Sequence, residues 1–220
     1  MIPVPDNIKS LLSKSPAFFS QLYTFNYTPA SYLHPTRRFQ FFEDALPALV
    51  WEEPRVWAKL SSLMLDQLGL SDQPCIDFPH PKWELALLPV SRQQRLAQHI
   101  GAIVLGARIR SSLAREQVLK WKEQLGQDTF QFVMNSARLL PTIRIEDEAL
   151  ENGDVEQIGY DMLCASVNDA PPEMRQRVLL KMPVQTKPTT ISPKLVNQLV
   201  QSVTLTLEAE WHSSFAVIKN

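Results

Sequence analysis

The chain has 220 residues, of which 45% are hydrophobic and 20% are charged, and its net charge is −1 at pH 7. This length is enough for a sizeable core, and the near-neutral charge argues against the strongly basic surfaces that bind nucleic acids or anionic membranes. Two widely separated cysteines, Cys75 and Cys164, argue against a disulfide framework and fit a reducing compartment.

We expect neither a signal peptide nor a membrane span. The N-terminal stretch lacks a charged region followed by a continuous apolar region, as a signal peptide would have. No apolar run reaches the roughly 20 residues that a membrane-spanning helix needs. The expected location is therefore the cytoplasm.

Six glycines and 17 prolines favour short helices separated by prolines over a β-protein, whose hairpins need glycine. We predict a mainly α fold, with short helices around a long central helix in one domain that spans residues 1–220. In the first half of the chain, capping residues, prolines and apolar spacing predict four helices. They lie at 6–12, at 15–23, from Phe39 up to Pro47, and from Pro54 to the end signal at Gly69.

The central helix is predicted within the run from 87 to 113, from Arg92 to about Ser111. Ser91 and Gln94 have the spacing of a capping box, and apolar residues follow at helical intervals. Small residues lower the helix propensity here, so we expect another helix to approach closely; they are Gly101, Ala102, Gly106 and Ala107.

Further helices are predicted at 113–125 with Gly126 as the end, from Asp128 to Pro141, at 155–167, at 172–182 and from Pro193 onward. Residues 184–192 look extended. In residues 203–211, apolar residues alternate with polar ones as in a strand, but apolar residues also recur at the i, i+4 spacing of a helix. We favour a helix, because no partner strand is evident.

No phosphate-binding, zinc-protease or serine-hydrolase motif occurs in the sequence. Cys75, Asp77 and His80 are metal-ligand types, but their spacing matches no known zinc site and a fourth ligand is missing. His99 and Cys164 lie in helical patterns without catalytic neighbours. We therefore predict no catalytic residue, no metal and no cofactor.

Three segments have both a structural and a binding interpretation. The acidic run at 146–156 fits a solvated turn before a helix, or an electrostatic docking patch that includes Glu148, Glu151 and Asp154. The basic run from Arg108 to Lys122 fits exposed helix faces, or a patch for an acidic protein. The aromatic segment from Tyr23 to Tyr32 fits core packing, or a protein-binding surface.

Two segments carry a resemblance to a known family. One is YTPASYLH at residues 27–34, and the other is LLPVSRQQRLAQHIGAIVLGARIRSSL at 87–113, preceded by LMLDQLGL. Their order, the chain length, the LLKMP turn at 179–183 and the closing amphipathic helix resemble the SctK (YscK/OrgA-type) family of type III secretion accessory proteins.

The resemblance implies a helical, non-enzymatic adaptor in the cytosolic sorting platform of the injectisome, at the inner membrane. Such proteins bridge the forkhead-associated-like cytoplasmic domain of the inner-membrane ring protein to the C-ring pod protein, and through it to the stator and the ATPase. They are needed for effector export and hence for virulence. The partner-binding candidates are Tyr27, Tyr32, Leu33, His34, Glu148, Glu151 and Asp154.

Two other functions remain open from the sequence. One is a small helical enzyme or regulator with an unrecognised site, which a bound metal or cofactor would indicate. The other is a type III secretion chaperone, which would usually be a more acidic α/β dimer.

Overall fold

The computed structural model describes residues 16–42, 46–76, 80–136, 154–184, 189 and 191–219, with side chains as far as Phe215. Within these ranges the regular structure is helical, and no strand occurs. The prediction of a mainly α protein is confirmed. The helices form two compact units: unit 1 contains residues 1–90, 169–184 and 213–220, and unit 2 contains residues 91–168 and 185–212. The single-domain assignment stays a prediction.

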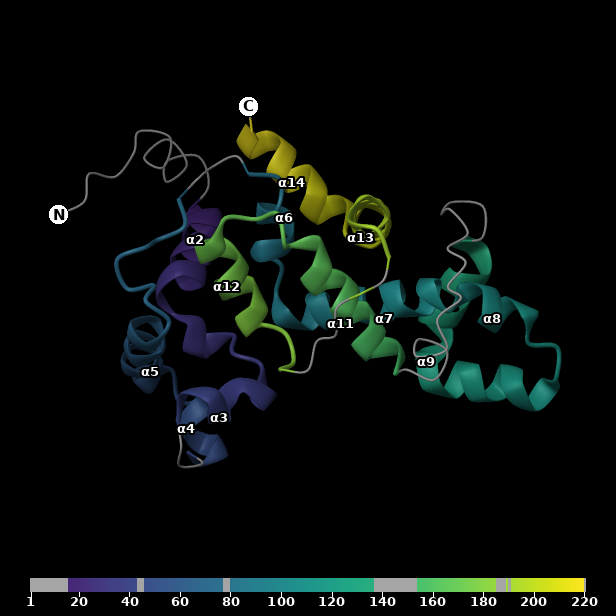
Figure 1. Ribbon diagram of the computed structural model, residues 1–220, viewed down its shortest axis with the longest axis horizontal. Coiled ribbons are helices and arrows are strands. Elements are labelled where there is room, and N and C mark those ends of the chain that lie inside the picture. The colour runs from purple at the N-terminus through teal and green to yellow at the C-terminus, as the bar shows by residue number, and fades with distance from the viewer. Residues whose placement is uncertain are drawn as a thin grey trace. The chain divides into compact units, whose positions relative to one another are not determined.

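Most of the helices in unit 1 begin at a proline. A proline fits the first helical position, where its missing N–H is not needed. The helices are α2 (Pro16–Tyr27), η1 (Pro29–Ser31), η2 (Pro35–Arg37), α3 (Arg38–Phe41), α4 (Ala48–Glu52), α5 (Pro54–Gln67), α6 (Trp83–Ala86) and α12 (Pro172–Leu180). Figure 1 labels α2 to α6 and α12 among them.

The boundaries of α5 follow the sequence prediction. Its N-cap Glu53 accepts a hydrogen bond from the Arg55 N–H at 3.3 Å. After its last turn, Gly69 has a φ of +67°, the left-handed conformation that glycine adopts at the end of many helices.

The core of unit 1 brings α12 together with helices from the first 90 residues. Phe25 of α2 meets Trp83 of α6 edge-on, with ring centroids 5.5 Å apart. Arg177 of α12 donates from Nε to the Asn26 carbonyl at 3.4 Å, although the two residues are 151 positions apart in sequence. Unit 1 is therefore discontinuous in sequence.

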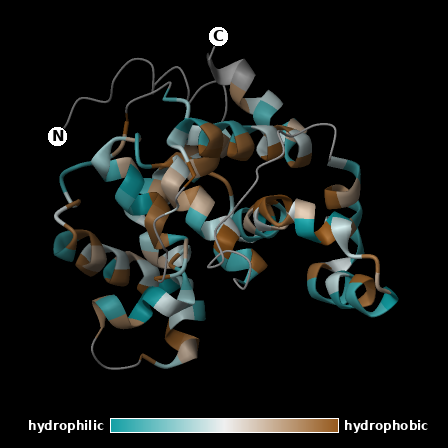
Figure 2. Cartoon of the chain, turned by 45° about the vertical axis from the view of Figure 1, so that its right-hand side comes forward, coloured by the Kyte–Doolittle hydropathy of each residue, from teal (hydrophilic) through white to brown (hydrophobic). Residues whose placement is uncertain are grey.

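Unit 2 contains most of α7 (Val90–Val104), with α8 (Gly106–Ser111), α9 (Arg115–Asn135), α11 (Val155–Ser166) and α13 (Pro193–Leu207), while α14 (Ala209–Lys219) has residues in both units. α11 packs against α13, and α8 packs against α9. Figure 2 shows hydrophobic and hydrophilic residues on different sides of many helices, as expected for helices with one face in a core.

The predicted central helix is divided in two. α7 ends at Val104 and α8 begins at Gly106, because Leu105 between them has a ψ of 5° instead of a helical value. α7 also begins at Val90, so Ser91 lies inside the first turn and not at the N-cap. The expectation of one continuous helix from Arg92 to about Ser111, capped by Ser91, was wrong at these points.

The expected close approach to the central helix is found at Gly101. A methyl carbon added there would lie 1.8 Å from the carbonyl oxygen of Val155 in α11. One added at Gly159 of α11 would lie 1.8 Å from the carbonyl oxygen of Ala97 in α7. The two helix backbones therefore cross in contact, and only glycine fits at both positions.

Most of the later helices agree with their predictions. α9 has a break at Gly126, with φ 75° and ψ 161°, where the first of two helices was expected to end. α11, α12 and α13 lie at the expected positions, and helix continues beyond residue 203, so the favoured interpretation of 203–211 is confirmed. The predicted helix at 6–12, the stop at Pro141 and most of 184–192 lie outside the described residues.

Candidate protein-docking surfaces

The segment YTPASYLH connects α2 to the rest of unit 1. The Ala30 N–H donates to Ser61 Oγ of α5 at 3.1 Å, and the His34 N–H donates to the Leu180 carbonyl of α12 at 2.8 Å. Two single-turn helices that begin at Pro29 and Pro35 hold the segment in a tight, ordered path. The backbone of this segment therefore joins three helices of unit 1.

Tyr32 and Leu33 are buried within unit 1. The Tyr32 hydroxyl donates to the Phe25 carbonyl at 2.6 Å, and the two rings stack with centroids 6.1 Å apart. Burial raises the pKa of Tyr32 far above its usual value, while the nearby Arg177 guanidinium acts in the opposite direction. Both residues thus stabilise the fold, and a part in partner binding stays a prediction.

His34 is half-buried at the start of η2. Its Nδ1 accepts a hydrogen bond from the Thr36 N–H at 3.3 Å, so the imidazole caps the short helix. Burial lowers the pKa of His34, and the neighbouring Arg37 and Arg38 lower it further. A neutral imidazole keeps Nδ1 available as the acceptor that the cap requires.

Tyr27 is an exposed aromatic residue at the end of α2. It is 44% exposed, and its ring centroid lies 5.1 Å from that of Tyr23, which is 52% exposed. Both side chains are on one face of α2, since they are four residues apart. Of the sequence candidates in this segment, Tyr27 is exposed and His34 is half-buried, so these two side chains are accessible to a partner.

Two buried cations, one on α12 and one directly after it, were not predicted from the sequence. Arg177 is 1% exposed, and it donates to the Leu70 carbonyl at 3.2 Å and to the Glu173 carbonyl at 3.1 Å, besides that of Asn26. Burial lowers the pKa of Arg177, and Tyr32 acts against this. Backbone carbonyls, and not carboxylates, satisfy this guanidinium.

Lys181 is the second buried cation. Its Nζ donates to the carbonyls of Ala86 at 2.5 Å and Leu88 at 3.0 Å, and it lies over the rings of Phe25 and Tyr32 at 5.4 and 5.1 Å. Burial lowers the pKa of Lys181 to about 7. The sequence does contain a signal, because Met174, Arg177, Val178 and Lys181 follow the i, i+3, i+4, i+7 spacing of a buried helix face.

The acidic run can be placed only at its end. Asp154 is the N-cap of α11, where its Oδ1 accepts a hydrogen bond from the Glu156 N–H at 3.2 Å. This contact stabilises the start of the helix in the way that aspartate commonly does. Glu148 and Glu151 lie outside the described residues.

The cysteines and histidines that drew attention in the sequence have structural contacts. Cys75 and Cys164 are both buried, and the backbone of Cys75 exchanges two hydrogen bonds with the side chain of Asn26. His99 lies edge-on to Phe132 at 5.0 Å, and burial lowers its pKa. Among the residues with described positions, no three His, Cys, Asp or Glu side chains gather as metal ligands.

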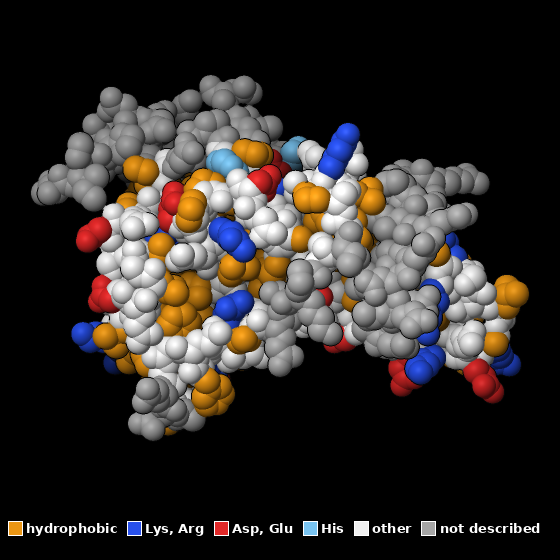
Figure 3. Space-filling view, in the orientation of Figure 1, with side chains coloured by type: hydrophobic (Ala, Val, Ile, Leu, Met, Phe, Trp, Pro, Cys, Tyr) orange, Lys and Arg blue, Asp and Glu red, His pale blue; other side chains and the backbone are white. Residues whose placement is uncertain are grey.

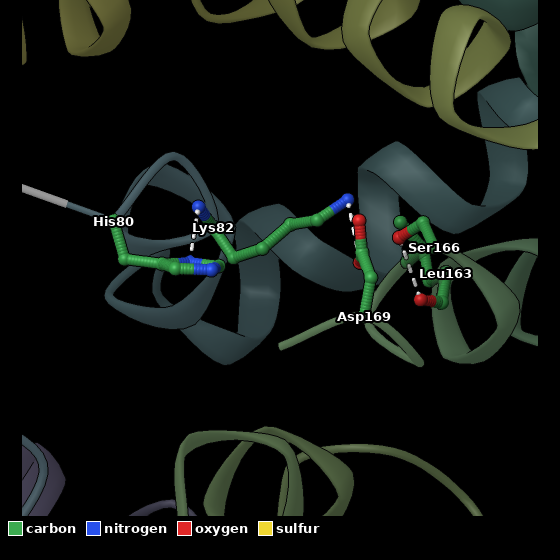
Figure 4. A network of polar contacts seen from close by, with 5 residues as sticks. All are labelled: His80, Lys82, Leu163, Ser166 and Asp169. Carbon is green, nitrogen blue, oxygen red and sulfur yellow. Dashed lines mark hydrogen bonds and ion pairs between the residues drawn. The ribbon is translucent and has the colours of Figure 1, made fainter. Parts of the chain in front are cut away.

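His80 also has a local role, which Figure 4 shows. Its Nδ1 accepts a hydrogen bond from the Lys82 N–H at 3.2 Å, just before α6 begins. The Lys82 Nζ forms an ion pair with Asp169 Oδ1 at 3.2 Å, within unit 1. In unit 2, the Ser166 hydroxyl donates to the Leu163 carbonyl at 2.8 Å near the end of α11. These contacts fix the ends of helices.

Comparison with family models matches residues 20–211 to the family described as YOP proteins translocation protein K (YscK). The chain belongs to the YscK family. This YscK-family protein is thus a type III secretion protein of the SctK/YscK type, as the resemblance implied. Curated protein sequences and solved structures gave no significant match.

The matched region of this YscK-family chain includes the YTPASYLH segment, both buried cations and the crossing of α7 with α11. The family is a group of secretion-system proteins and not a known family of enzymes. Among the helices that the structure describes, none is both long and apolar enough to cross a bilayer.

Proposed function

We propose that the protein is an adaptor in the cytosolic sorting platform of the type III secretion injectisome. It bridges the forkhead-associated-like domain of the inner-membrane ring protein, at the cytosolic face of that membrane, to the C-ring pod protein. Through the pod protein it is linked to the stator and the ATPase, and effector export requires it. The observation that carries this proposal is the YscK family match over residues 20–211.

The division into two units supports a bridging role. A bridge needs two separate docking surfaces, and each unit has its own core together with exposed apolar side chains. In unit 1 these include Tyr23, Tyr27, Phe39 and Leu49, and in unit 2 they include Leu113 and Leu119. Tyr23 and Tyr27 lie side by side, with ring centroids 5.1 Å apart, and neighbouring exposed aromatic side chains are typical of protein-binding sites.

Within unit 1, Tyr27 and His34 are our candidates for direct contact with a partner, and Tyr32 and Leu33 hold the segment that presents them. In unit 2, Glu148, Glu151 and Asp154 are the candidates for an electrostatic contact. Charges at the rim of an interface act more on the association rate and on salt dependence than on total affinity.

The test is calorimetric titration of the full chain against the purified inner-ring cytoplasmic domain and against the purified pod protein. We expect a dissociation constant in the micromolar range or tighter for each partner. A preformed complex with one partner should still bind the other at unchanged affinity. Failure to bind either partner, or mutual exclusion of the two, would contradict the bridge.

A further inference from the structure

A single glycine divides α9 into two helical halves. Gly126 lies between them with φ 75° and ψ 161°, a backbone conformation that is open essentially only to glycine. A methyl carbon added there would meet no atom of the described residues within 4 Å. Because glycine has several backbone conformations of similar energy, the angle between the two halves can change at this one residue.

The two halves differ in burial. The second half packs into unit 2 through three buried side chains: Thr129, Phe130 and Val133. Its Phe132 also lies edge-on to His99 of α7. In the first half, every residue from 115 to 124 is described, and none of them is buried. Figure 3 shows hydrophobic and charged side chains at the surface of this half, at the lower right of the view. We call residues 115–124 the α9 arm.

Both ends of the α9 arm are attached to well-held parts of unit 2. At one end, Leu125 is 3% exposed, and its carbonyl accepts a hydrogen bond from Gln98 Nε2 of α7 at 3.0 Å. At the other end, residues 112–114 join the arm to α8 without being helical. α8 is itself held, because Arg110 donates to the Val133 carbonyl at 3.3 Å. The arm is therefore a short helix between two joints.

Few contacts hold the α9 arm in its place. Its half-buried residues share one face, at i, i+3 and i+4: Val118, Trp121 and Lys122. Trp121 Nε1 donates to Ser112 Oγ at 3.2 Å, and the Arg108 guanidinium lies 5.9 Å from the Trp121 ring centroid. Lys122 Nζ lies 5.4 Å from the centroid of Phe130 in the second half. Segments with so few buried contacts open locally far more often than the core does.

We propose that the α9 arm is a hinged element that opens away from unit 2, with Gly126 and residues 112–114 as its joints and Trp121 as its latch. The second half of α9 stays in place. Opening turns Leu119 of the arm and Leu113 beside it, which are 53% and 93% exposed, in a new direction. The hinge thus changes the surface of unit 2 without unfolding its core.

Amide hydrogen exchange of the full chain, followed by NMR or mass spectrometry, tests the hinge. An isolated helix shorter than about 12 residues is marginal in water, so the opened arm loses its backbone hydrogen bonds. We expect amides 119–124 to be protected at least about tenfold less than amides 130–135 of the second half and those of α7. Equal protection of the three segments would overturn the proposal.

The joint is tested by G126A, with G69A as its matched control. Both glycines have a positive φ, and both have open space around the position of an added methyl carbon. Alanine disfavours the backbone conformation of the closed arm, so G126A should speed exchange of amides 119–124 about tenfold or more. G69A, after α5 in unit 1, should leave these amides unchanged. Unchanged or slower exchange of the arm in G126A would contradict the hinge.

The latch is tested by W121F, which keeps an aromatic ring and removes the indole N–H. Exchange of amides 119–124 should be about three- to tenfold faster, while that of amides 130–135 is unchanged. The control is W57F, because Trp57 is also half-buried and donates from Nε1 to the Trp51 carbonyl at 2.8 Å. W57F should not alter exchange of the arm.

Two results would refute the latch. One is an arm whose exchange is the same in W121F as in the wild type. The other is faster exchange throughout unit 2, which would show that Trp121 supports the whole core and not the arm alone. The inference is independent of the proposed function, because the chain shows it without a partner.

Discussion

Replacement of Gly159 by alanine tests the crossing of α7 and α11. On an isolated helix this change would stabilise by about 1 kcal/mol, because glycine is a poor helix former. Here the added methyl carbon would lie 1.8 Å from the Ala97 carbonyl oxygen and 2.4 Å from its carbonyl carbon. The three nearest atoms all belong to the backbone of Ala97 in α7, so rotating a side chain does not relieve the contact.

The two helices must therefore separate. Carbon–oxygen contacts are ordinarily about 3.3 Å or longer, so the backbones have to move apart by about 1.5 Å. Strain of this kind costs about 3 kcal/mol, which the gain in helix propensity reduces to a net loss of about 2 kcal/mol. With a denaturant slope of about 2 kcal/mol per molar urea, the midpoint of unfolding should fall by about 1 M.

The assay is urea unfolding followed by circular dichroism, with Gly106→Ala as the matched control. At Gly106 a methyl carbon would meet only the end of the Arg110 side chain, 2.8 Å away, which can move. Gly106→Ala should leave the midpoint unchanged or slightly raised. A midpoint for Gly159→Ala at or above that of the wild type would refute the close crossing of α7 and α11.

Three other substitutions probe buried or capping contacts. Burial lowers the pKa of Lys181 from its ordinary 10.5 to about 7 in the folded protein. Between these two pH values the Lys181 amine is protonated in the unfolded chain and neutral in the folded one. The free energy of unfolding should therefore rise with pH, by up to about 1.4 kcal/mol per pH unit. The midpoint of urea unfolding, measured from pH 7 to 9.5, should rise in the wild type and not in Lys181→Met. The same dependence of the midpoint on pH in both proteins would contradict the lowered pKa of Lys181. Asp154→Ala should lower stability by about 1 kcal/mol through loss of the α11 cap, and Asp154→Asn, which retains the acceptor, should not. Asn26→Ala leaves the backbone N–H and carbonyl of Cys75 without their side-chain partner, so the free energy of unfolding should fall by about 2–3 kcal/mol. Thermal or urea unfolding measures this loss. The control Gln124→Ala, at an exposed position, should change the free energy of unfolding little.

Local signals in the sequence were sufficient to predict most of the helices. Helix ends are set by the backbone conformation of single residues. Pro54 fits the first position of a helix, and Gly69 adopts the left-handed conformation after its end. Such effects do not depend on the rest of the fold. Small residues in an apolar helix also correctly indicated the close neighbour at Gly101, although they did not identify it as α11.

Features that depend on distant residues were not predictable in this way. The break at Leu105 interrupts a pattern whose apolar spacing continues through it, so periodicity alone did not reveal it. The spacing of Arg177 and Lys181 places them on an apolar helix face, but it does not reveal the carbonyls that bind them, most of which belong to residues far earlier in the sequence.

The site residues stay a prediction. The aromatic segment had two interpretations in the sequence, core packing and a protein-binding surface, and its side chains have different environments: Tyr32 packs inside unit 1, whereas Tyr27 is exposed. Sequence spacing does not distinguish these two cases, because the segment is too short and irregular for a periodic pattern.

The discontinuity of unit 1 has a consequence for how the protein is made. Its first 90 residues leave the ribosome well before Arg177 and Lys181, whose side chains bind four of the carbonyls in that part of the chain. At ordinary rates of translation the delay is roughly 5 to 20 s. During that time Phe25 and Trp83 lack α12 as a cover, so the nascent chain is most exposed to aggregation and to chaperones over that interval.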